Sequence, residues 1–143
     1  MKKLLLSFAL IGAITGLTTE YSLGEQCTTN DSNCNNFMTV LAENTQVSSC
    51  IKNAGVIRVT VTNKTEFETL VSITVTGPNN YNKTVPLFPL AGNETKDDIE
   101  FTGLINGSYT IAVTSPVFGC TFTCLIVVNN RKRNCLPLLC CSK

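Results

Sequence analysis

The feature that most constrains this fold is an alternation of apolar and polar residues with a period of two. It is clearest within Phe101–Cys120, where every second residue of Tyr109–Val113 is large and apolar. Successive side chains of a strand point to opposite faces, so this spacing places one apolar row on one face. Asn106-Gly107 before the run is a turn signal, and Ser115-Pro116 ends it, because proline cannot donate to a ladder.

The same alternation recurs along the chain, with no segment of helical period. We expect strands at Val56–Thr62, Leu70–Thr76, Tyr81–Leu87 and Thr121–Val128, with a further strand opening at Ile99. Gly77-Pro78-Asn79-Asn80 is a turn cluster, Pro86 favours a sheet edge, and the polar Ala91–Asp98 is expected to be a loop. The pattern predicts an all-β, antiparallel, immunoglobulin-like β-sandwich.

The predicted sandwich module spans 48–128, between two shorter segments. Residues 19–47 form a polar arm whose one apolar piece, Phe37–Ala42, suits either a helical turn or a short strand. Residues 129–143 form a basic, cysteine-rich tail. We expect disulfides to link both the arm and the tail to the sandwich. Arg131-Lys132-Arg133 in the tail fits a solvated turn, a proprotein cleavage site or a contact with a sulfated glycan.

The chain begins with the pattern of a secretory leader. Lys2-Lys3 supply the positive start and Leu4–Leu17 the apolar run, so we predict a signal peptide at 1–18, cut between 15 and 24. The run is shorter than the ~20 apolar residues that a bilayer span needs. The prediction is therefore a secreted, extracellular, or cell- or virion-surface protein without a transmembrane anchor after cleavage.

Eight cysteines, all downstream of this leader, suit an oxidising compartment. They are Cys27, Cys34, Cys50, Cys120, Cys124, Cys135, Cys140 and Cys141. An even cysteine count in a secreted chain indicates disulfides, with a pairing that spacing alone does not determine. The short spacings Cys120-x-x-x-Cys124 and Cys140-Cys141 leave metal binding as the alternative.

Five Asn-x-Ser/Thr sequons are candidate glycosylation sites. They begin at Asn30, Asn63, Asn82, Asn93 and Asn106. The densest acidic group contains Glu94, Asp97 and Asp98, where Asn93 and Asn106 could add oxygen ligands. Calcium needs several oxygens converging at about 2.3–2.6 Å, and a solvated loop explains the same residues.

Composition argues against catalysis and nucleic-acid binding. The chain has no histidine, which removes the usual general base near neutral pH, and no Gly-x-Ser-x-Gly or phosphate-binding glycine loop. Its net charge of +1 gives no global field that would attract nucleic acid. We expect no enzyme activity and no cofactor.

A set of residues at both ends of the module resembles a known repeat. Cys50, Gly55 and Val56–Thr62 open it, and Leu104, then Asn106–Thr110 (NGSYT), then Val113-Thr114 and Gly119-Cys120-Thr121 close it. This resembles the SprB-type repeat of bacterial gliding adhesins, to which other immunoglobulin-like repeats of large surface proteins are related. The resemblance covers Cys50–Thr123, about half of the chain. It implies that Cys50 pairs with Cys120, which would stabilise the fold by roughly 4 kcal/mol.

Three functions fit these observations. The first is a non-enzymatic, secreted or surface-displayed glycoprotein module for adhesion or outer-coat structure, with a protein or glycan surface as its partner and self-association left open. The second is a small secreted effector or inhibitor that binds a host protein. The third is a calcium- or carbohydrate-binding module that uses Glu94, Asp97 and Asp98.

Overall fold

The structure, a computed structural model, describes residues 25–29, 31–45 and 55–129. Within these ranges it contains nine strands and one short helix. The elements are β1 (Glu25–Gln26), β2 (Thr28–Thr29), α1 (Cys34–Phe37), β3 (Met38–Asn44), β4 (Gly55–Asn63), β5 (Thr69–Gly77), β6 (Tyr81–Leu90), β7 (Thr95–Leu104), β8 (Gly107–Ser115) and β9 (Cys120–Val128). The predicted signal peptide and the tail beyond Asn129 lie outside the described residues.

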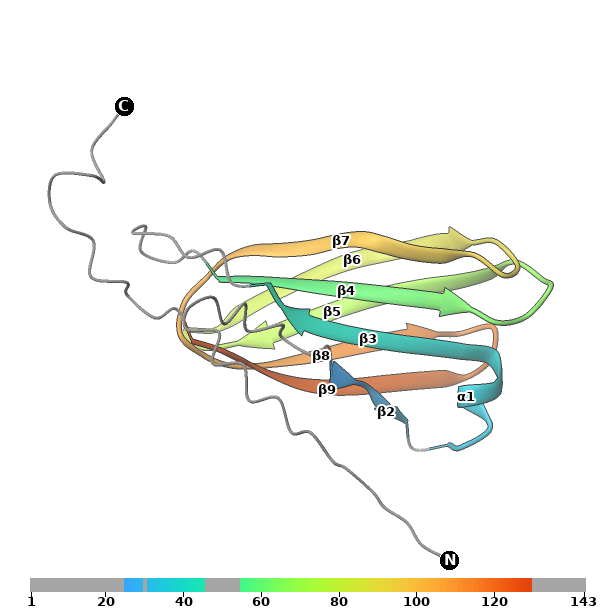
Figure 1. Cartoon of the computed structure of the whole chain (residues 1–143), viewed down its shortest axis with the longest axis horizontal. Helices are drawn as coiled ribbons and strands as arrows, with labels where there is room; N and C mark the ends of the chain where they lie inside the picture. Colours follow the sequence, from blue (N-terminus) through green and yellow to red (C-terminus); the bar gives the residue numbers. More distant parts are fainter. Residues whose placement is uncertain (1–24, 30, 46–54, 130–143) are drawn as a thin grey trace, which may run out of the picture.

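Two antiparallel sheets pack against each other, as the sequence predicts (Figure 1). The four-stranded sheet has the order β1-β3-β4-β7, and the five-stranded sheet has the order β2-β9-β8-β5-β6. The chain changes sheet between β1 and β2, and again between β2 and β3. Further along it changes sheet between β4 and β5, between β6 and β7, and between β7 and β8. These crossings are the Greek-key connections of an immunoglobulin-like sandwich, which confirms the predicted fold class.

The core is made of the alternate residues that face inward from both sheets. In β4, Ile57, Val59 and Val61 are fully buried, while the residues between them are partly exposed. β8 and β9 show the same alternation, with Tyr109 and Phe122 among the largest buried side chains. The period-two pattern therefore marks the core correctly on these strands.

The turn between β5 and β6 follows from its two asparagines. Asn79 and Asn80 have φ of 55° and 59°, and the Tyr81 N–H donates to the Pro78 carbonyl at 3.1 Å. Two successive residues at positive φ make a type I′ turn, which matches the twist of a hairpin. β6 is the edge strand of its sheet, as Pro86 predicts.

In its described part, the arm predicted at 19–47 belongs to the sandwich itself rather than lying outside it. β3 lies between β1 and β4 and buries Met38, Val40 and Ala42. The piece Phe37–Ala42, expected to be a helical turn or a short strand, takes part in both. Its first residue ends α1, and the rest begins β3. The sandwich therefore starts well before residue 48.

The loop expected at Ala91–Asp98 is shorter than its polar sequence suggests. β7 already begins at Thr95, where Thr95 pairs with Thr62 and Lys96 with Val61 of β4. An edge strand needs a partner on one side only, and its exposed positions tolerate charge. The polar residues 95–98 therefore form strand rather than loop.

Tyr109 fixes the crossing from β7 to β8. Its side chain is 1% exposed, and its hydroxyl donates to the Ile105 carbonyl at 3.1 Å. Its ring meets Tyr81 edge-on at 5.5 Å, and Gly77 lies so close to the ring that any side chain there would clash. A tyrosine near the start of a strand that bonds back to upstream backbone is the tyrosine corner of immunoglobulin-like folds.

Replacing Tyr109 by Phe removes only this hydroxyl. We expect Tyr109→Phe to lower the free energy of unfolding by about 1 kcal/mol, because the Ile105 carbonyl loses its donor. Tyr81→Phe is the matched control, since the shielded Tyr81 hydroxyl has no hydrogen-bond partner. That variant should change the free energy by less than about 0.5 kcal/mol. Urea unfolding at neutral pH measures both, and equal losses would contradict the corner's role.

The same two tyrosines predict a loss of stability at alkaline pH. Burial raises the pKa of both Tyr109 and Tyr81 above the usual value, because the phenolate loses water. The folded state then holds its protons more tightly than the unfolded state, so stability is constant below about pH 10 and falls above it. Urea unfolding of the double variant Tyr81→Phe/Tyr109→Phe should show a weaker fall between pH 9 and 11 than the parent chain, if these groups cause it.

Candidate functional site

Two disulfides tie the N-terminal segment to the last strand. Cys27 bonds Cys124, and Cys34 bonds Cys120. Cys27 lies between β1 and β2, where the chain passes from one sheet to the other, and all four cysteines are buried. The expectation of disulfides is therefore confirmed for these four. Cys50, Cys135, Cys140 and Cys141 lie outside the described residues.

The pairing implied by the adhesin resemblance is wrong, because Cys120 is bonded to Cys34. Cys120 starts β9 beside α1. The chain enters β4 at Gly55, which closely approaches Val128 at the other end of β9. The cysteine brought next to Cys120 is therefore the one on α1. The metal-binding alternative for Cys120-x-x-x-Cys124 is also wrong, since both sulfurs are in disulfides with different partners.

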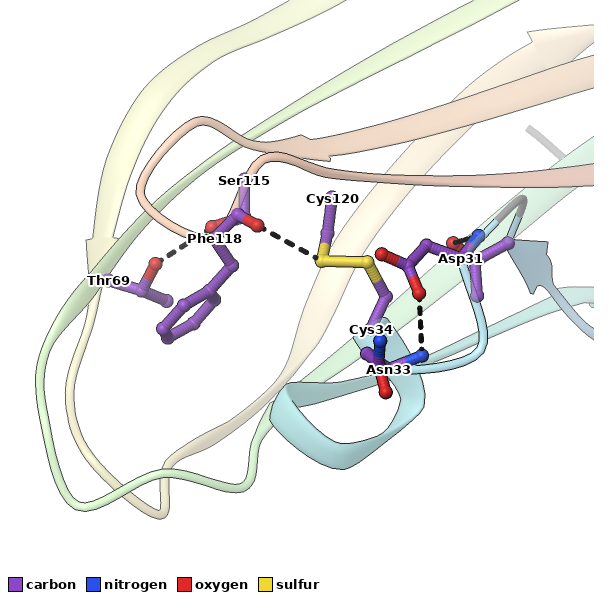
Figure 2. Close-up of a disulfide and its surroundings, with 8 residues drawn as sticks. Asp31, Asn33, Cys34, Thr69, Ser115, Phe118 and Cys120 are labelled. Carbon is purple, nitrogen blue, oxygen red and sulfur yellow. Dashed lines mark hydrogen bonds between the residues drawn. A yellow bond between two sulfur atoms is a disulfide. The ribbon is translucent and has the colours of Figure 1, made fainter.

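The surroundings of the Cys34–Cys120 bond hold α1 against the turn from β8 to β9 (Figure 2). Asp31 accepts the Asn33 N–H at 2.9 Å on its carboxylate, and its carbonyl accepts the Cys34 N–H at 3.0 Å, which starts the helical turn. Phe37 stacks on Phe118 with ring centres 4.9 Å apart. The covalent bond and the ring pair thus fix one end of the sandwich.

The acidic residues proposed for calcium do not form a common site. Glu94 accepts the Ala91 N–H at 2.7 Å within its own turn, and Asp98 pairs with Lys96 at 3.3 Å. Asn106 lies in the turn after β7, whereas Asn93 precedes β7. In the described part of the chain, no three acidic, histidine or cysteine side chains lie close enough to hold one metal ion.

Asn63 is a structural residue rather than a glycan acceptor. It is fully buried at the end of β4, and its Nδ2 donates to the carbonyls of Phe67 at 2.7 Å, Ala91 at 2.9 Å and Leu90 at 3.3 Å. Its Oδ1 accepts both the N–H and the hydroxyl of Thr65. A glycan attaches through Nδ2, which here is occupied and has no exposed surface, so Asn63 is removed from the candidate sites.

Three other sequon asparagines are exposed. Asn82 lies on β6, Asn93 in the turn between β6 and β7, and Asn106 in the turn between β7 and β8. Asn82 and Asn106 lie towards the end of the sandwich where Pro78 meets Gly107, and Asn93 lies at the other end. Glycosylation of these three remains a prediction, and Asn30 lies outside the described residues.

A charged ladder crosses the outer face of the four-stranded sheet. Arg58 of β4 contacts Glu100 of β7 at 2.7 Å and Glu43 of β3 at 3.7 Å. The hydrogen bond to Glu100 raises the pKa of the Arg58 guanidinium above its usual value. All three side chains are solvent-accessible, so the ladder contributes little stability and mainly marks this face as polar.

The sequence did not reveal the buried hydrogen-bond network of Asn63, which we call the anchor, or the charged ladder at Arg58. A signal for the anchor exists, because an Asn that ends a strand two residues before a Thr suits an Asx turn. The ladder has no local signal, since it joins three strands whose pairing becomes known only from the fold.

Comparison with known proteins adds no family to these observations. No protein-family model matches the chain, and no curated protein matches it either. Along the described ranges, no helix is long and apolar enough to cross a membrane. Function must therefore be inferred from the fold, the disulfides and the surfaces described above.

The anchor at Asn63 predicts a large cost for an isosteric change. Asn63→Asp keeps the shape but places an oxygen against three carbonyls, so we expect the free energy of unfolding to fall by at least about 3 kcal/mol. Asn82→Asp, on the exposed β6, is the control and should change it by less than about 0.5 kcal/mol. Urea unfolding tests both, and glycopeptide mass spectrometry should find Asn63 unmodified. Similar costs for the two variants, or a glycan on Asn63, would refute the assignment.

The two disulfides should stabilise the fold in a non-additive way. With either bond intact, the other closes a loop of only about 11 residues, seven from Cys27 to Cys34 and four from Cys120 to Cys124. Replacing one pair by alanine should therefore cost roughly 3 kcal/mol, whereas replacing both pairs should cost roughly 7 kcal/mol, more than twice the single effect.

Urea unfolding of the two double variants and the quadruple variant measures this difference. Peptide mapping without reductant supplies an independent check, since it should recover Cys27 linked to Cys124 and Cys34 linked to Cys120. A peptide that links Cys50 to Cys120 would contradict the structure, and strictly additive losses would contradict the loop argument.

Proposed function

We propose that this chain is a non-enzymatic module that works outside the cytoplasm, secreted or displayed on a surface, in adhesion or in an outer coat. The observation that carries the proposal is the pair of buried disulfides that joins Cys27 and Cys34 to β9. Structural disulfides persist in oxidising compartments and are rare in the cytosol.

Further observations support this proposal. The predicted leader at 1–18 would deliver the chain to such a compartment. Asn82, Asn93 and Asn106 are exposed, so a secretory pathway that attaches glycans could modify them without disturbing the core. The resemblance of Cys50–Thr123 to adhesin repeats also favours a role in adhesion. Cys120 nevertheless pairs with Cys34, and not with Cys50 as the resemblance implied.

Binding would use the outer faces, strand edges and turns of the sandwich. Immunoglobulin-like sandwiches keep a rigid core and present their variable chemistry at these positions. The inner faces of the sheets pack against each other through apolar side chains, so a partner would contact the outer surface. A protein or glycan surface remains the partner that we propose.

Fractionation of the native source with intact-mass analysis tests the proposal. We expect a chain cut between residues 15 and 24, without free thiols, in the cell- or particle-associated fraction and accessible to protease added to intact cells or particles. Leu5→Asp/Leu6→Asp, which interrupts the apolar run, should keep the chain inside the cell. An uncut chain with reduced cysteines in the cytosol would refute the proposal, and a monomer found only in the medium would favour the secreted effector.

A further inference from the structure

The outer face of the five-stranded sheet has a composition unlike the rest of the surface. We call it the uncharged face and define it by the even-numbered residues of β5 (70–76) and β8 (108–114), the odd-numbered residues of β9 (121–127), and Asn82 and Thr84 of β6. Strand register places all of these on one side of the sheet. Six of these positions on β5, β8 and β9 are threonines, at 74, 76, 110, 114, 121 and 123, and none of the defining positions is charged.

The uncharged face combines a row of threonines with exposed apolar side chains at one end. Thr74, Ala112 and Thr123 lie in register across β5, β8 and β9 and continue to Thr84 of β6. The hydroxyls of Thr74 and Thr84 bond each other at 3.1 Å. A hydroxyl satisfied within the sheet leaves a methyl group free for outside contact. At one end of β9, Leu125 and Val127 are 56% and 61% exposed.

The two outer faces of the sandwich differ in whether they carry charged side chains. The four-stranded sheet carries the ladder of Glu43, Arg58 and Glu100. On the five-stranded sheet, Lys83 of β6 is exposed, but it pairs with the inward-facing Val75 and so belongs to the opposite side from the uncharged face. A charged partner would therefore find no counter-charge on the uncharged face.

We propose that the uncharged face is the surface through which two copies of this chain associate, sheet against sheet, about a twofold axis. A threonine hydroxyl both donates and accepts, so a threonine-rich surface can satisfy a copy of itself across such an axis. An array of lysines or glutamates would repel its own copy. Neutrality and dual hydrogen-bonding capacity together make this face self-complementary.

The available area suits a weak dimer. β5, β8 and β9 are nine residues long, and β6 is ten. Three strands about 4.8 Å apart and about 30 Å long, with about 10 Å of β6, cover roughly 480 Å² in each copy. Two copies would bury roughly 960 Å², the size of a weak, transient interface. The dimer should therefore form reversibly and dissociate on dilution.

As an account of how a coat or adhesive surface assembles, this association rests on the proposed function. As a property of the purified chain, it is measured separately. A chain that dimerises but is found in the cytosol would refute only the proposed function. A surface-located chain that stays monomeric would refute only the dimer.

Sedimentation equilibrium of the full chain carrying Asn82→Gln, which removes any glycan from the face without adding a charge, tests the association. The decisive variant is Thr110→Lys, because Thr110 is exposed between Thr76 and Leu125. A lysine there would be desolvated in the interface without a counter-charge, so we expect the dimer Kd to rise at least about tenfold. Thr102→Lys, on exposed β7 of the other sheet, is the matched control and should leave Kd unchanged.

Unfolding curves identify any variant that fails to fold, in which case Thr123→Lys on the exposed side of β9 replaces Thr110→Lys. Association through a neutral face should also change less than about threefold in Kd between low and high salt. A parent chain that is monomeric up to near-millimolar concentration would overturn the proposal. So would a Thr110→Lys chain that associates as tightly as the parent, or a Thr102→Lys chain that is weakened equally.

Discussion

The structure depends on the contact between two rows of inward-facing side chains, one from each sheet. Ile57, Val59 and Val61 of β4 belong to one row, and Val71 and Ile73 of β5 to the other. A shift of any strand by one residue would turn its apolar row to solvent, so burial fixes register as well as stability. The turns, the disulfides and the tyrosine corner then close a sandwich whose pairing is already determined.

Much of the fold follows from this alternation, and the exceptions have physical reasons. β4, β5, β8 and β9 were predictable because each places several β-branched residues at period two. β3 was not, because its apolar stretch is brief and lies within a polar segment. Thr95–Asp98 of β7 was not, because an edge strand can be polar and still pair on one side. Local sequence does not reveal which strand becomes an edge.

The candidate sites were less predictable, because their chemistry depends on which residues meet in space. The sequence indicates disulfides but not that Cys34 faces Cys120, which follows from the position of α1 beside the β8–β9 turn. Asn63 and Asn82 carry the same kind of sequon, yet one amide is sealed inside the fold and the other is exposed. Burial separates them, and burial belongs to the whole sandwich rather than to three consecutive residues.

The bond between Cys27 and Cys124 also determines how the chain would respond to mechanical tension. Residues 28–123, which include all but the first strand and the end of β9, lie inside the covalent loop that this bond closes. If the two ends of the polypeptide are pulled apart, the force passes from Cys27 to Cys124 directly through the sulfur atoms. The chain within the loop cannot be extended, and the load reaches only β1 and the last residues of β9, which lie outside it. Under tension the module would then yield at most at these two short ends, whereas an unbridged domain would extend along its whole length.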